Sequence, residues 1–174
     1  PGVFEPAIDL PAEVLASGTC PDERLALLWP VLTRHLSGGA RLEFDASFPP
    51  TWGLGSSSAS TLAAAAALAG PGLERFYEVR DAQRALQGAA SGYDAATQLL
   101  GGAVAYRDGD PAELESIEPG APLQWVVAWT GEKVSTGGLI RDVRSRHPVG
   151  APIYQAIGDL AEEGIQPGSA SGRE

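Results

Sequence analysis

The chain has 174 residues and a formal net charge of −10, from 22 acidic and 12 basic residues. This balance argues against a nucleic-acid-binding protein, which carries a basic patch or stripe, but not against an anionic ligand held by backbone amides. The hydrophobic content of 44% is that of a globular protein with a core, large enough for one domain or one domain and part of a second.

The single cysteine, Cys20, cannot form a disulfide within the chain and fits a reducing compartment. No secretory signal is evident, and the longest apolar run, Leu62–Ala69, is too short to cross a bilayer. We therefore expect a cytoplasmic protein whose partners include no membrane and no nucleic acid. No group of His, Cys, Asp and Glu has metal-ligand spacing, so no structural metal is expected.

The first half of the chain predicts a helix followed by a strand, after residues 1–20 that show no clear period. Asp22–Leu36 has helical spacing, with Pro30 expected to kink or split the helix. Its apolar face holds Leu25, Leu28, Trp29, Leu32 and Leu36. Arg41–Phe48 alternates between apolar and polar residues, which predicts a half-buried strand.

A glycine- and serine-rich loop, Gly53–Ser60, follows this strand and opens an alanine-rich helix over Thr61–Ala69. Its glycines permit positive φ and close approach of a ligand to the backbone. The serines stand where the helix begins, where unpaired amides and the helix dipole favour a phosphate and a hydroxyl can ligate Mg²⁺. From these residues alone, a glycine turn followed by a serine N-cap is the alternative.

Helices and strands alternate irregularly after the loop, which favours the α+β class over a doubly wound sheet. We expect helices over Leu73–Gln87, closed by Gly88, and from Ser91 to Leu100. The remaining expected elements are a strand at Ala103–Tyr106, a connection at Asp108–Pro122, a strand at Gln124–Trp129, a turn at Thr130–Lys133, helices at Ser135–His147 and Ile153–Glu163, and a polar tail at Gln166–Glu174.

Several polar residues have ordinary structural interpretations. Ser91-x-x-Asp94 fits a capping box, in which the acidic side chain bonds back to the start of its helix. His35 and His147 lie at helix ends, where capping or solvation is the default. Arg75, Arg80 and Arg84 share one helix, whose arginines are expected to form a solvated face.

Three segments resemble motifs of the GHMP kinases, the family of galactokinase, homoserine kinase and mevalonate kinase. Pro50–Ala59 resembles the family's ATP-binding loop, and Gln87–Ala96 resembles the segment that carries its catalytic aspartate. Trp129–Thr136 resembles the turn that opens the family's C-terminal domain. The Ser91–Ala96 stretch is most similar to phosphomevalonate kinase, with mevalonate kinase next.

The resemblance implies a role for each matching residue. Asp94 becomes the catalytic base or the group that orients the acceptor. Ser57 becomes the Mg²⁺ ligand, and the ATP-binding residues are Gly53, Leu54, Gly55, Ser56, Ser57 and Ser58. The substrate-binding residues are Ser91, Gly92, Ser135 and Thr136, and the cofactors are ATP and Mg²⁺.

The resemblance also implies a fold and an activity. Residues 1–120 would form an N-terminal domain like ribosomal protein S5 domain 2, without its usual first strand. Residues 121–174 would begin a ferredoxin-like C-terminal domain. The implied activity is an ATP-dependent kinase for a phosphomevalonate-like small molecule, and a homodimer is compatible with it.

Other functions stay open at this point. Mevalonate kinase and diphosphomevalonate decarboxylase use the same scaffold. A non-catalytic nucleotide-binding module is favoured by two departures: the family's early lysine strand is not evident, and Gln83 stands where mevalonate kinase has a Mg²⁺-binding glutamate. A purely structural α+β domain is the third alternative.

Overall fold

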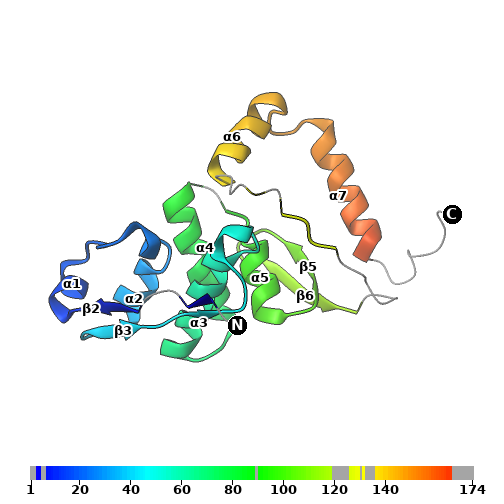
Figure 1. Cartoon of the computed structure of the whole chain (residues 1–174). Coiled ribbons are helices and arrows are strands. Elements are labelled where there is room, and N and C mark those ends of the chain that lie inside the picture. Colours follow the sequence, from blue (N-terminus) through cyan, green and yellow to red (C-terminus); the bar gives the residue numbers. More distant parts are fainter. Residues whose placement is uncertain are drawn as a thin grey trace. The chain divides into compact units, whose positions relative to one another are not determined.

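The computed structural model describes residues 3–4, 7–88, 90–118, 126–129, 131 and 136–165. The chain forms two compact units, Pro1–Leu100 and Gly101–Glu174. Helices and two-stranded antiparallel sheets are mixed along the chain (Figure 1), in agreement with the predicted α+β class. The domain boundary expected after residue 120 lies beside residues outside the described set and stays a prediction.

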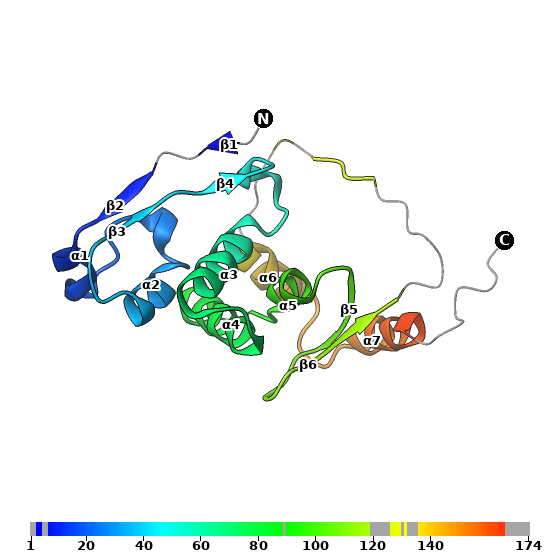
Figure 2. The ribbon, with the colours of Figure 1, turned by 90° about the horizontal axis from the view of Figure 1, so that it is seen from below.

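An antiparallel ribbon occupies the start of the first unit. Strand β1 (Val3–Phe4) pairs with β4 (Asp45–Ala46), and β2 (Ile8–Leu10) pairs with β3 (Ala40–Leu42); Figure 2 shows the two pairs following one another. The predicted alternation of half-buried and exposed side chains holds throughout 41–48. The prediction of one continuous strand is wrong, because two separate segments of chain pair with its two ends.

The next helices enclose the main hydrophobic cluster. Helix α1 (Ala12–Ser17) precedes a 3-10 turn, η1 (Glu23–Leu25), and helix α2 (Trp29–His35). The single helix predicted over Asp22–Leu36 is therefore split, and proline occupies the first turn of α2, where its missing N–H costs nothing. The predicted apolar face is confirmed: the buried cluster comprises Leu10, Leu15, Leu25, Leu28, Trp29, Val31, Leu32 and Ala65, with Leu36 packed against it.

Three helices of the first unit pack side by side, as Figures 1 and 2 both show. They are α3 (Ser56–Ala69), α4 (Leu73–Gln87) and α5 (Tyr93–Leu100), preceded by the 3-10 turn η2 (Pro50–Trp52). All three helices were predicted, although α3 begins at Ser56, five residues before the predicted span Thr61–Ala69. Gly88 ends α4 with a left-handed φ of 75°, the conformation that made glycine the expected residue there.

The second unit contains a hairpin and two helices. Strand β5 (Ala103–Arg107) pairs with β6 (Glu113–Ile117), so the prediction of a connection over Asp108–Pro122 is wrong for β6. The acidic residues that indicated a loop lie on exposed positions of the strand, where Glu113 pairs across the hairpin with Arg107.

Helices α6 (Thr136–Arg146) and α7 (Pro152–Ile165) complete the described part of this unit and agree with the two predicted helices. Val126–Trp129, the described part of the strand predicted over Gln124–Trp129, belongs to no strand. The predicted tail Gln166–Glu174 and all of the predicted turn except Gly131 lie outside the described residues. Among the helices described, none has the length and apolar character needed to traverse a bilayer.

Candidate functional site

The glycine- and serine-rich loop makes two left-handed turns immediately before α3. Gly53 has φ 74° and Gly55 has φ 72°, a region that costs other residues roughly 1–2 kcal/mol. The hydroxyl of Ser56 donates to the carbonyl oxygen of Pro50 at 3.2 Å and closes the loop. These glycines are therefore required by the backbone conformation, as the sequence predicted.

Helix α3 begins at Ser56 with Gly55 as its N-cap, and no described side chain caps it. The alternative of a serine N-cap is therefore wrong for this helix. Ser60 and Thr61 donate to carbonyl oxygens one turn earlier, and Ser57 is exposed on the first turn. The open end presents backbone amides and the positive end of the helix dipole, the arrangement that binds phosphate groups elsewhere.

A comparison of the two glycines gives a testable prediction. A Cβ at Gly55 would lie 2.7 Å from Nε2 of Gln98, whereas nothing lies within 4 Å of one at Gly53. Both Gly→Ala variants bear the left-handed strain, but only Gly55→Ala also displaces the amide that donates to the Gly55 carbonyl. We expect Gly55→Ala to lower the free energy of unfolding by about 1 kcal/mol more than Gly53→Ala in urea denaturation. Equal losses would contradict the contact.

Asp94 lies on the first turn of α5 and contacts the first turn of α3. The Ser58 hydroxyl donates to Oδ2 of Asp94, and the Gln83 side-chain amide donates to the same oxygen at 3.0 Å. Oδ1 accepts the Ala95 amide at 2.9 Å. The chain thus brings the predicted loop and the predicted catalytic aspartate together, although they are far apart in sequence.

Sequence reasoning assigned no role to Gln98. It lies one turn after Asp94 on α5 and donates to the carbonyl oxygen of Gly55 at 3.0 Å. Helix α5 therefore contacts both the loop and the start of α3. The signal available in the sequence was the i, i+4 spacing, which puts Gln98 and Asp94 on one face of the helix.

Gly92 lies just before α5, against side chains of α4. Its φ is 85°, and a Cβ there would lie 2.9 Å from the Arg80 side chain and 3.2 Å from the Phe76 ring. The guanidinium of Arg80 lies over the rings of Phe76 and Tyr77, 5.3 and 4.9 Å from their centroids. Gly92 is buried and Ser91 exposed, and their predicted roles in substrate binding stay predictions.

Two of the three arginines expected on a solvated face are buried. Arg80 is 3% exposed and Arg75 is 7% exposed, so that expectation is wrong for both. Arg80 is accommodated because a planar guanidinium stacks on aromatic faces. Arg75 is accommodated by an ion pair with Glu78 at 3.0 Å.

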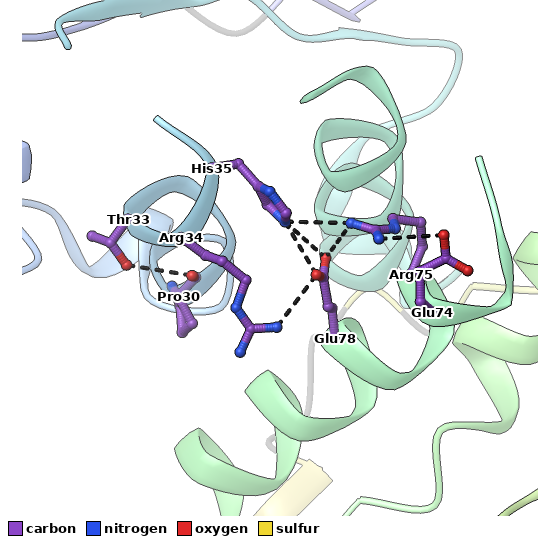
Figure 3. Close-up of polar contacts among 7 residues, drawn as sticks. All are labelled: Pro30, Thr33, Arg34, His35, Glu74, Arg75 and Glu78. Atoms are coloured by element: carbon purple, nitrogen blue, oxygen red, sulfur yellow. Dashed lines mark hydrogen bonds and ion pairs between the residues drawn. The ribbon is translucent and has the colours of Figure 1, made fainter. Parts of the chain in front are cut away.

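Glu78 is the centre of a charged cluster between α2 and α4 (Figure 3). Its carboxylate accepts hydrogen bonds from Arg75 and Arg34 and lies 3.1 Å from Nε2 of His35. Burial alone would raise the pKa of Glu78, but the bonds to His35 and Arg34 and the charge of Arg75 outweigh it and lower that pKa. The prediction that His35 is capping or solvated is wrong, because its side chain is mostly buried against this carboxylate.

The remaining predicted site residues are placed as follows. Leu54 is exposed beside the loop. Ser58 is buried and its hydroxyl is engaged by Asp94, so only its amide can serve the predicted contact with phosphate. Thr136 begins α6 in the second unit, and Ser135 lies outside the described residues. Within the described ranges, no three His, Cys, Asp or Glu residues are grouped as a metal site.

Comparison with known proteins adds one match. Residues 24–102 match the family model for the GHMP kinases N terminal domain. The matched segment contains the loop, helices α3 to α5 and Asp94, and is a little under half of the chain. Searches of curated proteins and of solved structures gave no match. The match supports the resemblance of residues 24–102 to the N-terminal domain of the GHMP kinases.

Proposed function

We propose that this chain acts as a GHMP-type kinase, which transfers the γ-phosphoryl group of ATP to a small acceptor of the phosphomevalonate kind. The observation that carries the proposal is the juxtaposition of the uncapped start of α3 with the Asp94 carboxylate. The start of α3 suits phosphate binding, and the Asp94 carboxylate suits acceptance of a proton. The family match over residues 24–102 supports the reaction class.

The proposed reaction follows from these two groups. The acceptor oxygen forms a bond to the γ-phosphorus while the bond from that phosphorus to the β,γ-bridging oxygen breaks, and the electron pair leaves with ADP. The attacking oxygen belongs to the phosphate group of the acceptor, and the proton of the monoanionic phosphate passes to Asp94, whose Oδ1 bears one hydrogen bond under 3 Å and retains acceptor capacity. The amides of the first turn of α3 offset the charge of the phosphates without rearrangement.

Mg²⁺ fits this site as a metal held mainly by the nucleotide. It binds proteins through one or two oxygen ligands, with phosphate oxygens and waters completing the octahedron. Ser57 offers an exposed hydroxyl on the same turn as the phosphate-binding amides. When bound, Mg²⁺ would neutralise phosphate charge and keep the leaving oxygens in place.

Ligand binding is the first test of the proposal. Calorimetry should detect MgATP binding, and the thermal midpoint should rise with ligand concentration. Absence of both heat and thermal shift would exclude every nucleotide-binding function. ADP release with mevalonate, phosphomevalonate and diphosphomevalonate then separates a kinase from a non-catalytic binding module, which would bind but release no ADP.

Replacement of Ser57 tests the metal contact. We expect Ser57→Ala to weaken MgATP binding about tenfold, the equivalent of roughly 1.4 kcal/mol for one lost oxygen ligand. Binding of ATP without Mg²⁺ should change less than twofold. The control is Ser60→Ala on the same helix, whose hydroxyl bonds back to the Ser56 carbonyl. Equal weakening with and without the metal would disprove the contact.

The S5-like and ferredoxin-like folds, the division at residue 120, the homodimer and the cytoplasmic location are parts of the same proposal. Mevalonate kinase and diphosphomevalonate decarboxylase activities are distinguished from it by the same acceptor panel, because each consumes a different acceptor.

A further inference from the structure

Gln83 is a buried polar residue on the side of α4 that faces α3 and α5. It is 6% exposed and follows Phe76 and Val79 on the buried stripe of the helix. Its Nε2 donates to the Ser58 hydroxyl oxygen at 2.7 Å and to Oδ2 of Asp94 at 3.0 Å. A polar side chain in such a position costs free energy unless its hydrogen bonds are made.

The three side chains of Gln83, Ser58 and Asp94 form a closed ring of hydrogen bonds. The amide of Gln83 has two protons, one for each of the other two residues. The Ser58 oxygen therefore accepts a hydrogen bond from Gln83, and the Ser58 hydroxyl donates its own hydrogen bond to Asp94. The reverse amide orientation would place an acceptor oxygen against a carboxylate, so the ring has one consistent arrangement.

The ring gives the two oxygens of the Asp94 carboxylate different hydrogen-bond partners. Oδ2 receives two side-chain donors from the buried side, whereas Oδ1 receives the Ala95 amide and only a long 3.4 Å contact from Gln83. The side chains of α3 and α4 thus hold the carboxylate at Oδ2, and its rotation would break these two hydrogen bonds. The other oxygen keeps the capacity to accept a proton from a substrate.

We infer that Gln83 is a positioning residue, which acts through Asp94 by fixing Oδ2 so that Oδ1 meets the attacking group of the acceptor. This inference rests on the kinase function proposed above. Gln83 needs no contact with nucleotide or acceptor in this role, because its two donors are already occupied by Ser58 and Asp94. Its Oε1 is buried without a partner among the described residues, so the positioning role is assigned to the Nε2 donor.

The test replaces Gln83 in two backgrounds. Gln83→Met removes both donors at similar volume, and we expect kcat to fall about tenfold, as for loss of one hydrogen bond to a charged group. KM for MgATP should stay within twofold. In an Asp94→Ala background the same replacement should change kcat by less than twofold, because the residue it acts through is absent. Gln155→Met, at an exposed position of α7, is the control that should leave wild-type kcat unchanged.

The outcomes are distinct. An equal tenfold loss in both backgrounds, or a raised KM with unchanged kcat, overturns the inference while the kinase proposal stands. A wild-type protein that releases no ADP with any acceptor overturns both. If Gln83→Met does not fold, Ser58→Ala replaces it in the same double-mutant cycle, because it removes the other donor to Oδ2.

Discussion

Asp94→Ala is expected to lower kcat about 10²–10⁴-fold, the range for loss of a general base, while MgATP binding changes less than twofold. Asp94 lies at the start of α5 and accepts a hydrogen bond from the Ser58 side chain of α3, not from a backbone amide of the loop, so we expect the loop amides to keep their positions. Phosphoryl transfer depends strongly on positioning and charge neutralisation, so some turnover should remain. ADP release under single-turnover conditions and calorimetry with MgATP measure the two quantities.

Two further variants make this prediction specific. Asp94→Asn retains the shape of the side chain and, with its oxygen in the Oδ2 position, the bonds from Ser58 and Gln83. It loses acceptance from the Ala95 amide and cannot accept a proton as a carboxylate does, so it should lose nearly as much turnover as Asp94→Ala. Asp81→Asn removes an exposed carboxylate from α4 and should change neither quantity. Wild-type kcat in Asp94→Asn would show that the residue is only a structural hydrogen-bond acceptor.

Glu78→Gln is expected to be the most destabilising of the variants considered. The change leaves the mostly buried guanidinium of Arg75 without its nearest anion and weakens the bonds from Arg34 and His35. Removal of one partner of a buried ion pair costs about 3 kcal/mol. For a unit of this size the thermal midpoint should fall by roughly 10–20 °C. Thermal and urea denaturation followed by circular dichroism provide the measurement.

The neighbouring Glu74 offers a matched control, visible beside Arg75 in Figure 3. Its side chain is 62% exposed and pairs with Arg75 at 3.4 Å. An exposed pair contributes roughly 0–1 kcal/mol, so Glu74→Gln should cost less than a third of the Glu78→Gln effect. Comparable losses of stability in the two variants would mean that the burial of Glu78 does not determine how strongly its ion pairs stabilise the fold.

The effect of Glu78 should also depend on pH. Its pKa in the folded protein is lowered from 4.5, so the folded state binds fewer protons than the unfolded state just below that pH. The stabilisation is therefore complete above pH 4.5 and is lost as pH falls through the lowered pKa. The difference between wild type and Glu78→Gln should shrink in acid. Hydrogen bonds from Arg24 lower the pKa of Asp22 to about 2. This contribution to the pH dependence is the same in both proteins and cancels from the difference.

The sequence predicted the elements whose signals are local. The left-handed Gly53 and Gly55, the start of α3 at Ser56 and the closing Gly88 each follow from the conformational freedom of glycine and the helical preference of alanine. The approach of Asp94 to this loop was expected only from the resemblance, because nothing in residue spacing places α5 beside α3.

Features that depend on a distant partner were not predictable in the same way. Strand β6 appeared to be a loop because its acidic residues are exposed, and its pairing with β5 is what makes it a strand. Arg80 appeared to be a surface residue because its aromatic neighbours lie on adjacent turns of a helix whose burial was unknown. Gln83 carried a usable signal, an amide at helical spacing after Phe76 and Val79 on the buried face of α4.

Helix α5 has only eight residues, and it carries both Asp94 and the tether from Gln98 to Gly55. A helix of two turns moves as a rigid unit, because its backbone hydrogen bonds resist bending. On the proposed function, a nucleotide that displaces Gly55 would also shift the Asp94 carboxylate, because the Gln98 amide and the Ser58 hydroxyl both join α5 to this end of α3.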